Sequence, residues 1–244
     1  MTIWCVCPFS RAQFLGNVLA NFDQQSFGDR RLVLVTNGGA AQVSYAHPRM
    51  SLLRSPGGVS APMNVGLAYV RENARPLDWF CKWDDDDYYG SDYLMALARV
   101  AAHGARAAAR SKVFMRTPEG NLWTVDNGTK WPHGPTLAAR VDASVNFPEV
   151  MGWGEDGLWW QAMVERGVEF ANIAPAGFCW MRYPKGHGHA YPLQSRHFRM
   201  LGLDIEDFGA FDVRIVDGLV SRAGTSLEPT EMDLADFSAA LGVA

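Results

Sequence analysis

The sequence has little cysteine, no long apolar run and no strong excess of either charge. Its four cysteines among 244 residues fit neither a zinc site nor a disulfide framework, so we predict reduced thiols in the core. No stretch approaches the roughly 20 apolar residues that a membrane span needs. The apolar start TIWCVCPF is too short for a signal peptide and lacks a basic lead-in. We therefore expect a cytoplasmic protein with no membrane span.

The balance of charge and apolar residues is that of an ordinary globular protein. The net charge is -4, so the composition does not favour nucleic acid as an obligatory partner. Hydrophobic residues make up 48% of the chain and charged residues 20%, enough to build a sizeable core. The chain contains no repeat, low-complexity tract or linker. We predict one domain over residues 1–200 and an extension, 201–244, that packs on it and carries no chemical signature.

The first 40 residues predict a strand, a helix and a second strand. TIWCVCPF is a buried strand ended by Pro8. SRAQFLGNVLANFDQQSF has helical spacing of its apolar residues, with Ser10 as the expected N-cap. RRLVLVTNGG is a second strand ended by a turn signal. This unit implies a parallel sheet with a right-handed crossover.

The rest of the chain alternates in the same way. Single strands are expected in HPRMSLLRS and LDWFCKW. Mixed strands and loops are expected between SKVFMRTPEG and PTLAARV, and VEFANIAPAGFCWMRYP is expected to hold two further strands. Helices are expected in the segment after SPGGVS, in SDYLMALARVAAHGARAA and in EDGLWWQAMVERG, which Gly167 closes. The pattern predicts an α/β fold whose mostly parallel central sheet is flanked by helices.

Four aspartates, Asp84–Asp87, stand directly after the strand LDWFCKW. Ligands of open α/β sheets bind at the carboxyl ends of strands, so this run lies where a site is expected. In an extended segment Asp84 and Asp86 would share one face, and such hard oxygen donors suit Mg²⁺ or Mn²⁺. The alternative is a solvated acidic turn in which Asp87 caps the next helix. The position after a buried strand favours the divalent-ion site.

The segment WFCKWDDDDYYGSDYL resembles the Asp-x-Asp segment of family-2 glycosyltransferases of the GT-A fold. The similarity runs from about Ile3 to His189. The opening strand and VCPFSRAQF resemble the family's first strand and TYNR loop, and SAPMNVGLA resembles its ARNIGL. GPTLAARV and GWGEDGLWWQAMVERGVEFANI match its later segments in order and spacing. The resemblance implies a GT-A, Rossmann-like fold and a nucleotide-sugar donor.

Residue roles follow from the resemblance at matching positions. The third aspartate of the family's run binds the metal that bridges the donor diphosphate, which implies Asp86 and a Mn²⁺ or Mg²⁺ cofactor. The first two lie near the ribose, which implies Asp84 and Asp85. A histidine further along completes the metal shell in several members, which implies His187, with His189 as the other candidate. The other implied donor-binding residues are Pro8, Phe9, Ser10, Arg11, Thr36, Asn37, Asn64 and Lys82.

Two departures from the family pattern concern the donor. The aspartate that reads the base in VDDGS is absent, which leaves Thr36 and Asn37, so a UDP-type and a GDP-type donor both remain open. The arginine of ARN is Pro62. Three basic residues remain candidates to replace its phosphate contact: Lys82, Arg71 and Arg11.

GWGEDGLWW places two carboxylates at a helix start. Asp156 is either a cap for free N–H groups or, as the resemblance implies, the general base of an inverting transfer. We favour the base, with Glu155 binding acceptor hydroxyls. Trp153 is the candidate to stack on the acceptor, whereas Trp159 and Trp160 are expected in the core.

These features predict a metal-dependent inverting glycosyltransferase that acts on an acceptor hydroxyl. A polysaccharide, a protein, a small metabolite and a modified base in DNA all remain open as acceptors. A sugar-1-phosphate nucleotidyltransferase is one alternative, but CPFSRAQF lacks the glycine- and arginine-rich loop that it requires. A glycoside hydrolase would use paired carboxylates without a nucleotide. A non-catalytic sugar- or cation-binding module is the third alternative.

Overall fold

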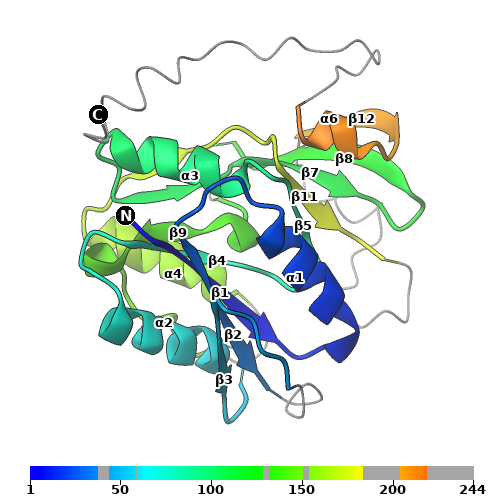
Figure 1. Ribbon diagram of the computed structural model, residues 1–244. Helices are drawn as coiled ribbons and strands as arrows, with labels where there is room; N and C mark the ends of the chain where they lie inside the picture. The colour runs from blue at the N-terminus through cyan, green and yellow to red at the C-terminus, as the bar shows by residue number, and fades with distance from the viewer. Residues whose placement is uncertain (38–43, 59, 129–131, 151–153, 184–203, 219–244) are drawn as a thin grey trace, which may run out of the picture.

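The computed structural model shows two β-sheets with helices packed against the larger one (Figure 1). It describes residues 1–37, 44–58, 60–128, 132–150, 154–183 and 204–218. Trp153, His187 and His189 lie outside these residues. In the described residues, no helix has the length and apolar character to cross a membrane.

The main sheet has seven strands in the order β10-β6-β9-β4-β1-β2-β3. β1 pairs in parallel with β2 and β4, β2 with β3, and β6 with β10, while β9 is antiparallel to both its neighbours. The predicted mostly parallel sheet is therefore confirmed. The strands are β1 (Ile3–Phe9), β2 (Arg30–Thr36), β3 (Met50–Arg54), β4 (Trp79–Lys82), β6 (Ala107–Ala109), β9 (Ala138–Arg140) and β10 (Phe170–Asn172).

Helices cover both faces of this sheet (Figure 1). On one face, apolar side chains of α1 (Leu15–Asp23) and α3 (Tyr93–Ala102) pack on the strands. On the other, α2 (Ala61–Asn73) and α4 (Glu155–Glu165) do the same, and Trp159 is buried there as predicted. Each strand alternates its side chains between these two cores, which is why the strands read as continuous apolar runs.

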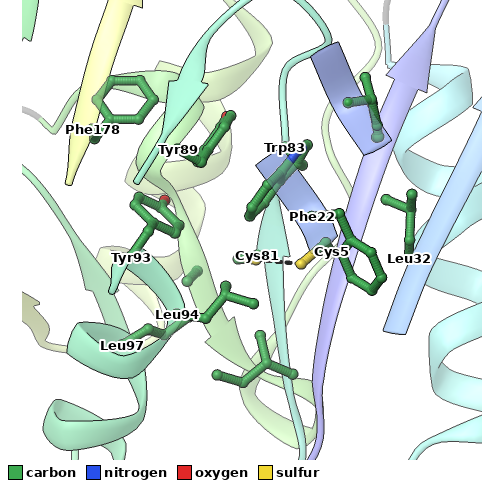
Figure 2. Packing of buried hydrophobic residues seen from close by; sticks show 14 of the residues in the cluster. Cys5, Phe22, Leu32, Cys81, Trp83, Tyr89, Tyr93, Leu94, Leu97 and Phe178 are labelled. Carbon is green, nitrogen blue, oxygen red and sulfur yellow. Dashed lines mark hydrogen bonds between the residues drawn. The ribbon is translucent and has the colours of Figure 1, made fainter. Parts of the chain in front are cut away.

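The four cysteines are free and buried, as the sequence predicts. Two of them lie together in the core between the sheet and α1 and α3, where the Sγ of Cys81 donates a hydrogen bond to the Sγ of Cys5 over 3.7 Å (Figure 2). Figure 2 also shows Trp83, Tyr89 and Tyr93 close by. The rings of Trp83 and Tyr89 stack with centroids 3.9 Å apart. This aromatic packing anchors the two ends of the aspartate run.

Helix ends were predicted with mixed success. α4 ends as expected: Gly167 has φ +71°, and Gly167 and Val168 donate backbone hydrogen bonds to Val164 and Met163. The N-cap prediction for Ser10 is wrong. Arg11 remains extended and the chain first turns into a 3₁₀ helix, η1 (Ala12–Phe14), before α1 begins. The extended backbone lets the Arg11 side chain reach the aspartate run, as described below.

The second sheet has five strands in the order β12-β8-β7-β11-β5 and lies to one side of the main sheet (Figure 1). The sequence indicated strands here but not a separate sheet. β12 comes from the predicted extension and pairs antiparallel with β8. The strands are β5 (Tyr88–Tyr89), β7 (Lys112–Arg116), β8 (Asn121–Asp126), β11 (Phe178–Met181) and β12 (Asp204–Ala210), and α6 (Val213–Val216) follows them.

Candidate functional site

The strand order reverses at the centre of the main sheet. From β1 the chain builds β2 and β3 on one side, and then returns to place β4 on the other side of β1. β1 and β4 are parallel, so their carboxyl ends meet at one edge. Such a reversal point is where open α/β sheets bind ligands. Arg11 follows β1 there and Asp84–Asp87 follow β4.

The aspartate run is a buried turn. Asp85, Asp86 and Asp87 are 2%, 6% and 2% exposed, so the interpretation as a solvated acidic turn is wrong. Asp87 does not cap α3: its Oδ1 accepts a hydrogen bond from the Met181 N–H of β11 at 3.0 Å. Burying carboxylates is costly unless they are paired, so the site must supply partners.

The predicted alternation of faces along the run is also wrong. Arg11 binds both Asp85 and Asp86: one guanidinium nitrogen contacts an Asp85 oxygen, and Nη1 lies 2.9 Å from Asp86 Oδ2. Asp85 and Asp86 can both contact the Arg11 guanidinium because they form a turn, whereas in a strand their side chains would point to opposite faces. Burial raises the pKa of Asp85 to about 6, although Arg11 opposes this rise.

Two asparagines of α1 hold the turn, and sequence reasoning missed them. Asn17 Nδ2 donates to the carbonyls of Asp85 and Asp87 at 2.7 and 3.0 Å. Asn21 Nδ2 donates to the carbonyl of Asp87 at 2.8 Å. Their i, i+4 spacing puts both amides on one helix face, and this was the available signal. These bonds satisfy backbone carbonyls that the buried turn cannot pair with a strand.

The donor set of the turn fits a hard divalent ion. Carboxylate oxygens are the preferred protein ligands of Mg²⁺ and Mn²⁺, and Mg²⁺ sites commonly combine one or two carboxylates with substrate phosphates. Within the ranges that the structure describes, no three His, Cys, Asp or Glu side chains are grouped as a complete metal site. The turn therefore fits an ion that a ligand's phosphates help to hold.

Asp156, in the first turn of helix α4, is linked to the aspartate turn through Lys82. Its Oδ2 accepts a hydrogen bond from Lys82 Nζ at 2.7 Å, and the same Nζ lies 3.3 Å from Asp84 Oδ1. Its Oδ1 is buried and has no hydrogen-bond partner among the described residues. Burial raises the pKa of Asp156 to about 6, against the attraction of Lys82 and with the repulsion of Glu155 and Asp84.

The structure does not support the capping interpretation of Asp156. The N-cap of α4 is Gly154, with φ +108°, and no side chain makes a capping hydrogen bond to it. Asp156 also packs closely against Gly134. A β-carbon added to Gly134, in the 3₁₀ helix η3 (Gly134–Thr136), would lie 2.1 Å from Asp156 Oδ2. Only glycine leaves room for the carboxylate at this position, a requirement that the sequence did not reveal.

The remaining sequence-predicted donor residues lie at or near the same sheet edge. Phe9 and Thr36 end β1 and β2 with buried side chains, and the Thr36 hydroxyl donates to the Leu53 carbonyl. The Asn37 side-chain oxygen is buried without a hydrogen-bond partner among the described residues. Asn64 exchanges two hydrogen bonds of 2.8 Å with the backbone of Phe147, so its amide braces α2. Ser10 is exposed and Pro8 half-buried.

Arg71 is separated from this edge. It lies in the last turn of α2, where its guanidinium donates to Asn146 and Ser144. α2 runs from the edge that holds the site toward the opposite one, because it connects two parallel strands. Of the three basic residues considered for a phosphate contact, Arg11 and Lys82 are at the site.

Comparison with protein-family models and with curated proteins finds no match to this chain. Solved structures do match. One is S. aureus TarS 1–349 in complex with UDP-GlcNAc, with a TM-score of 0.56 and 15% identity over 77% of this chain and 60% of that chain. The chain has a glycosyltransferase fold. Another match is the mannosyltransferase PcManGT from Pyrobaculum calidifontis in complex with GDP-Man and Mn²⁺, with a TM-score of 0.55 and 16% identity over 76% of this chain and 58% of that chain.

These glycosyltransferases share the GT-A type of mixed α/β architecture with the chain, which confirms the predicted fold class. The chain spans about three fifths of the length of both structures. A third structure, 4-diphosphocytidyl-2C-methyl-D-erythritol synthase, has a TM-score of 0.49 and 16% identity over 82% of this chain and 96% of that chain. A score below 0.5 gives no basis for assigning a function.

Proposed function

We propose that the protein is a divalent-metal-dependent inverting glycosyltransferase, which moves a sugar from a nucleotide-diphosphate sugar to an acceptor hydroxyl. The observation that carries the proposal is the meeting of three groups at the reversal point of the sheet: the buried aspartate turn, Arg11 and the Lys82-bound Asp156. The solved structures of similar fold, with UDP-GlcNAc or with GDP-Man and Mn²⁺, support a nucleotide-sugar donor. A cytoplasmic location, predicted from the sequence, remains part of this proposal.

The aspartate turn is proposed to bind the donor. In this proposal Asp84 and Asp85 contact the ribose, and Asp86 holds Mn²⁺ or Mg²⁺. When bound, this ion neutralises the diphosphate and stabilises it as a leaving group. Arg11, already at Asp86, supplies a second positive charge beside the same phosphates. The predicted metal ligand His187 and the predicted acceptor residue Trp153 lie outside the described residues.

Asp156 is proposed as the general base. As the acceptor oxygen attacks the anomeric carbon, its proton passes to a carboxylate oxygen of Asp156, and the bond to the diphosphate breaks on the opposite face of the sugar. A pKa of about 6 leaves Asp156 mostly ionised at neutral pH, yet more basic than an ordinary aspartate. Glu155 adjoins it in the same helical turn, where we expect acceptor hydroxyls to bind.

Donor binding tests the proposal directly. We expect UDP- or GDP-sugars to raise the melting temperature in the presence of Mn²⁺, because a ligand that binds only the folded state stabilises it. The effect should disappear with EDTA, and isothermal calorimetry on the best donor then gives its affinity. Absence of binding by every nucleotide sugar with Mn²⁺ would instead favour a module that binds sugars or cations without catalysis. Release of free sugar from an oligosaccharide without a nucleotide would indicate a hydrolase.

Gly134→Ala is expected to reduce transfer strongly and to leave donor binding intact. The new methyl group would overlap Asp156 Oδ2 and displace the base, and an error of about 1 Å in a catalytic group costs on the order of 100-fold in rate. Two quantities are measured for each variant: kcat for sugar transfer, and the affinity for the donor by calorimetry. Gly157→Ala is the matched control, because a β-carbon there meets nothing within 4 Å. Equal kcat values for the two variants would contradict this placement of Asp156.

A further inference from the structure

Lys82 is a buried lysine whose amine contacts two carboxylates, Asp84 from its own segment and Asp156 from the distant helix α4. It ends β4 and is 6% exposed. Its Nζ lies 2.7 Å from Asp156 Oδ2 and 3.3 Å from Asp84 Oδ1. Burial tends to lower the pKa of Lys82, but the attraction of Asp156 and Asp84 outweighs burial and raises the pKa above its ordinary value. Lys82 is therefore a charged amine that both carboxylates stabilise.

The contact makes the two oxygens of Asp156 unequal. Oδ2 accepts the hydrogen bond of the Lys82 amine and lies so close to Gly134 that an added β-carbon there would be 2.1 Å from it. Oδ1 is buried, with no hydrogen-bond partner in the parts of the chain that the structure describes. A hydrogen bond to one oxygen of a carboxylate fixes the orientation of the whole group, and therefore the direction in which its oxygens can accept a proton. A general base requires a carboxylate held in one orientation, since proton transfer depends on an oxygen at hydrogen-bond distance that points at the proton.

We propose that Lys82 is a positioning residue, which holds Asp156 through Oδ2 and so fixes the carboxylate that receives the proton of the acceptor hydroxyl. The same amine reaches Asp84, so it also ties the base to the donor side of the site. This inference rests on the proposed function and deepens it. It differs from the sequence-based prediction of Lys82 as a donor-binding residue and one of three candidates for a phosphate contact, because its amine contacts two protein carboxylates.

The test compares Lys82→Gln, which retains a donor without charge, with Lys82→Arg, which retains the charge. We expect Lys82→Gln to lower kcat by about 10- to 100-fold, through misplacement of the base, with the donor KM unchanged. Its acid limb of kcat/KM should move to higher pH by about one unit or more, because an opposite charge beside a carboxylate lowers its pKa. Lys82→Arg should lose less activity and keep the acid limb in place. Lys112→Gln, on β7 of the second sheet, is the matched control and should behave as wild type.

Other results would overturn the inference. A higher donor KM and weaker binding of UDP or GDP, with an unmoved acid limb, would make Lys82 a phosphate ligand. Wild-type kcat in Lys82→Gln would remove the positioning role. If Lys82→Gln does not fold, Lys82→Arg decides alone: wild-type kcat in that variant contradicts the need for a precisely placed amine.

A measurement without catalysis separates this inference from the proposed function. The carboxyl ¹³C signal of Asp156, assigned by its loss in Asp156→Asn, can be titrated by NMR in the nucleotide-free protein. It should titrate at higher pH in Lys82→Gln than in wild type or Lys82→Arg. An identical titration in all three proteins would show that Lys82 does not hold Asp156. A wild-type protein that transfers sugar from no donor would reject the proposed function, whatever the titration shows.

Discussion

Asp156→Asn is expected to abolish sugar transfer while leaving the nucleotide affinity at its wild-type value. An amide keeps the shape of the side chain but has no basic oxygen, and general-base catalysis contributes about 10²–10⁴-fold. The substitution removes the charge that Lys82 neutralises, but it keeps an oxygen to accept the Nζ hydrogen bond, so the fold should survive. kcat measured beside calorimetry of the donor complex checks both halves of the expectation.

The pH dependence of the wild-type protein provides an independent check on the same residue. The base acts only when ionised, so kcat/KM should fall as the pH drops through the pKa of Asp156, about 6. Asp142→Asn is the matched control, because its ion pair with Arg140 lies at the start of β4, away from the site. Wild-type transfer by Asp156→Asn would assign the base to another group, and Glu155→Gln would be the next variant to measure.

Asp86→Ala is expected to remove the metal-dependent part of donor binding. Removing a residue that only hydrogen-bonds to a metal ligand lowers metal affinity by about 10- to 100-fold. Removing the ligand itself should therefore lower the affinity for UDP or GDP with Mn²⁺ by about 100-fold or more. With EDTA, wild type and variant should bind the nucleotide equally weakly. Arg11 keeps its contacts with Asp85 in the variant, which limits the damage to the turn.

Asp142→Ala is the control for this second measurement as well, since it removes an aspartate at the opposite sheet edge. Mn²⁺ that strengthens nucleotide binding equally in wild type and Asp86→Ala would show that Asp86 does not bind the ion. If Asp84→Ala lost the metal effect instead, the ligand would be two residues earlier in the run. Both outcomes would leave the role of Asp156 untouched, because Asp156 contacts the turn only through Lys82 in the interactions described above.

The position of the candidate site in the fold could be predicted from the sequence, but the orientation of its side chains could not. The aspartates follow a buried strand, so their location at the carboxyl edge followed from the chain alone. Their orientation did not, because it depends on Asn17, Asn21 and Arg11, which approach from a different segment. The same holds for Gly134, whose missing side chain matters only once α4 lies against it.

Local sequence determined the strands, the helices and the type of fold, because apolar periodicity and turn residues act over a few neighbouring positions. It also placed Asp84–Asp87 directly after a strand and Asp156 at a helix start, where the structure has them. Only the tertiary structure decided their partners: that Arg11 binds Asp85 and Asp86, and that Lys82 binds Asp156, 74 residues away. Ion pairs of this kind form between segments brought together by the packing of the sheet, and no pattern within either segment specifies the other.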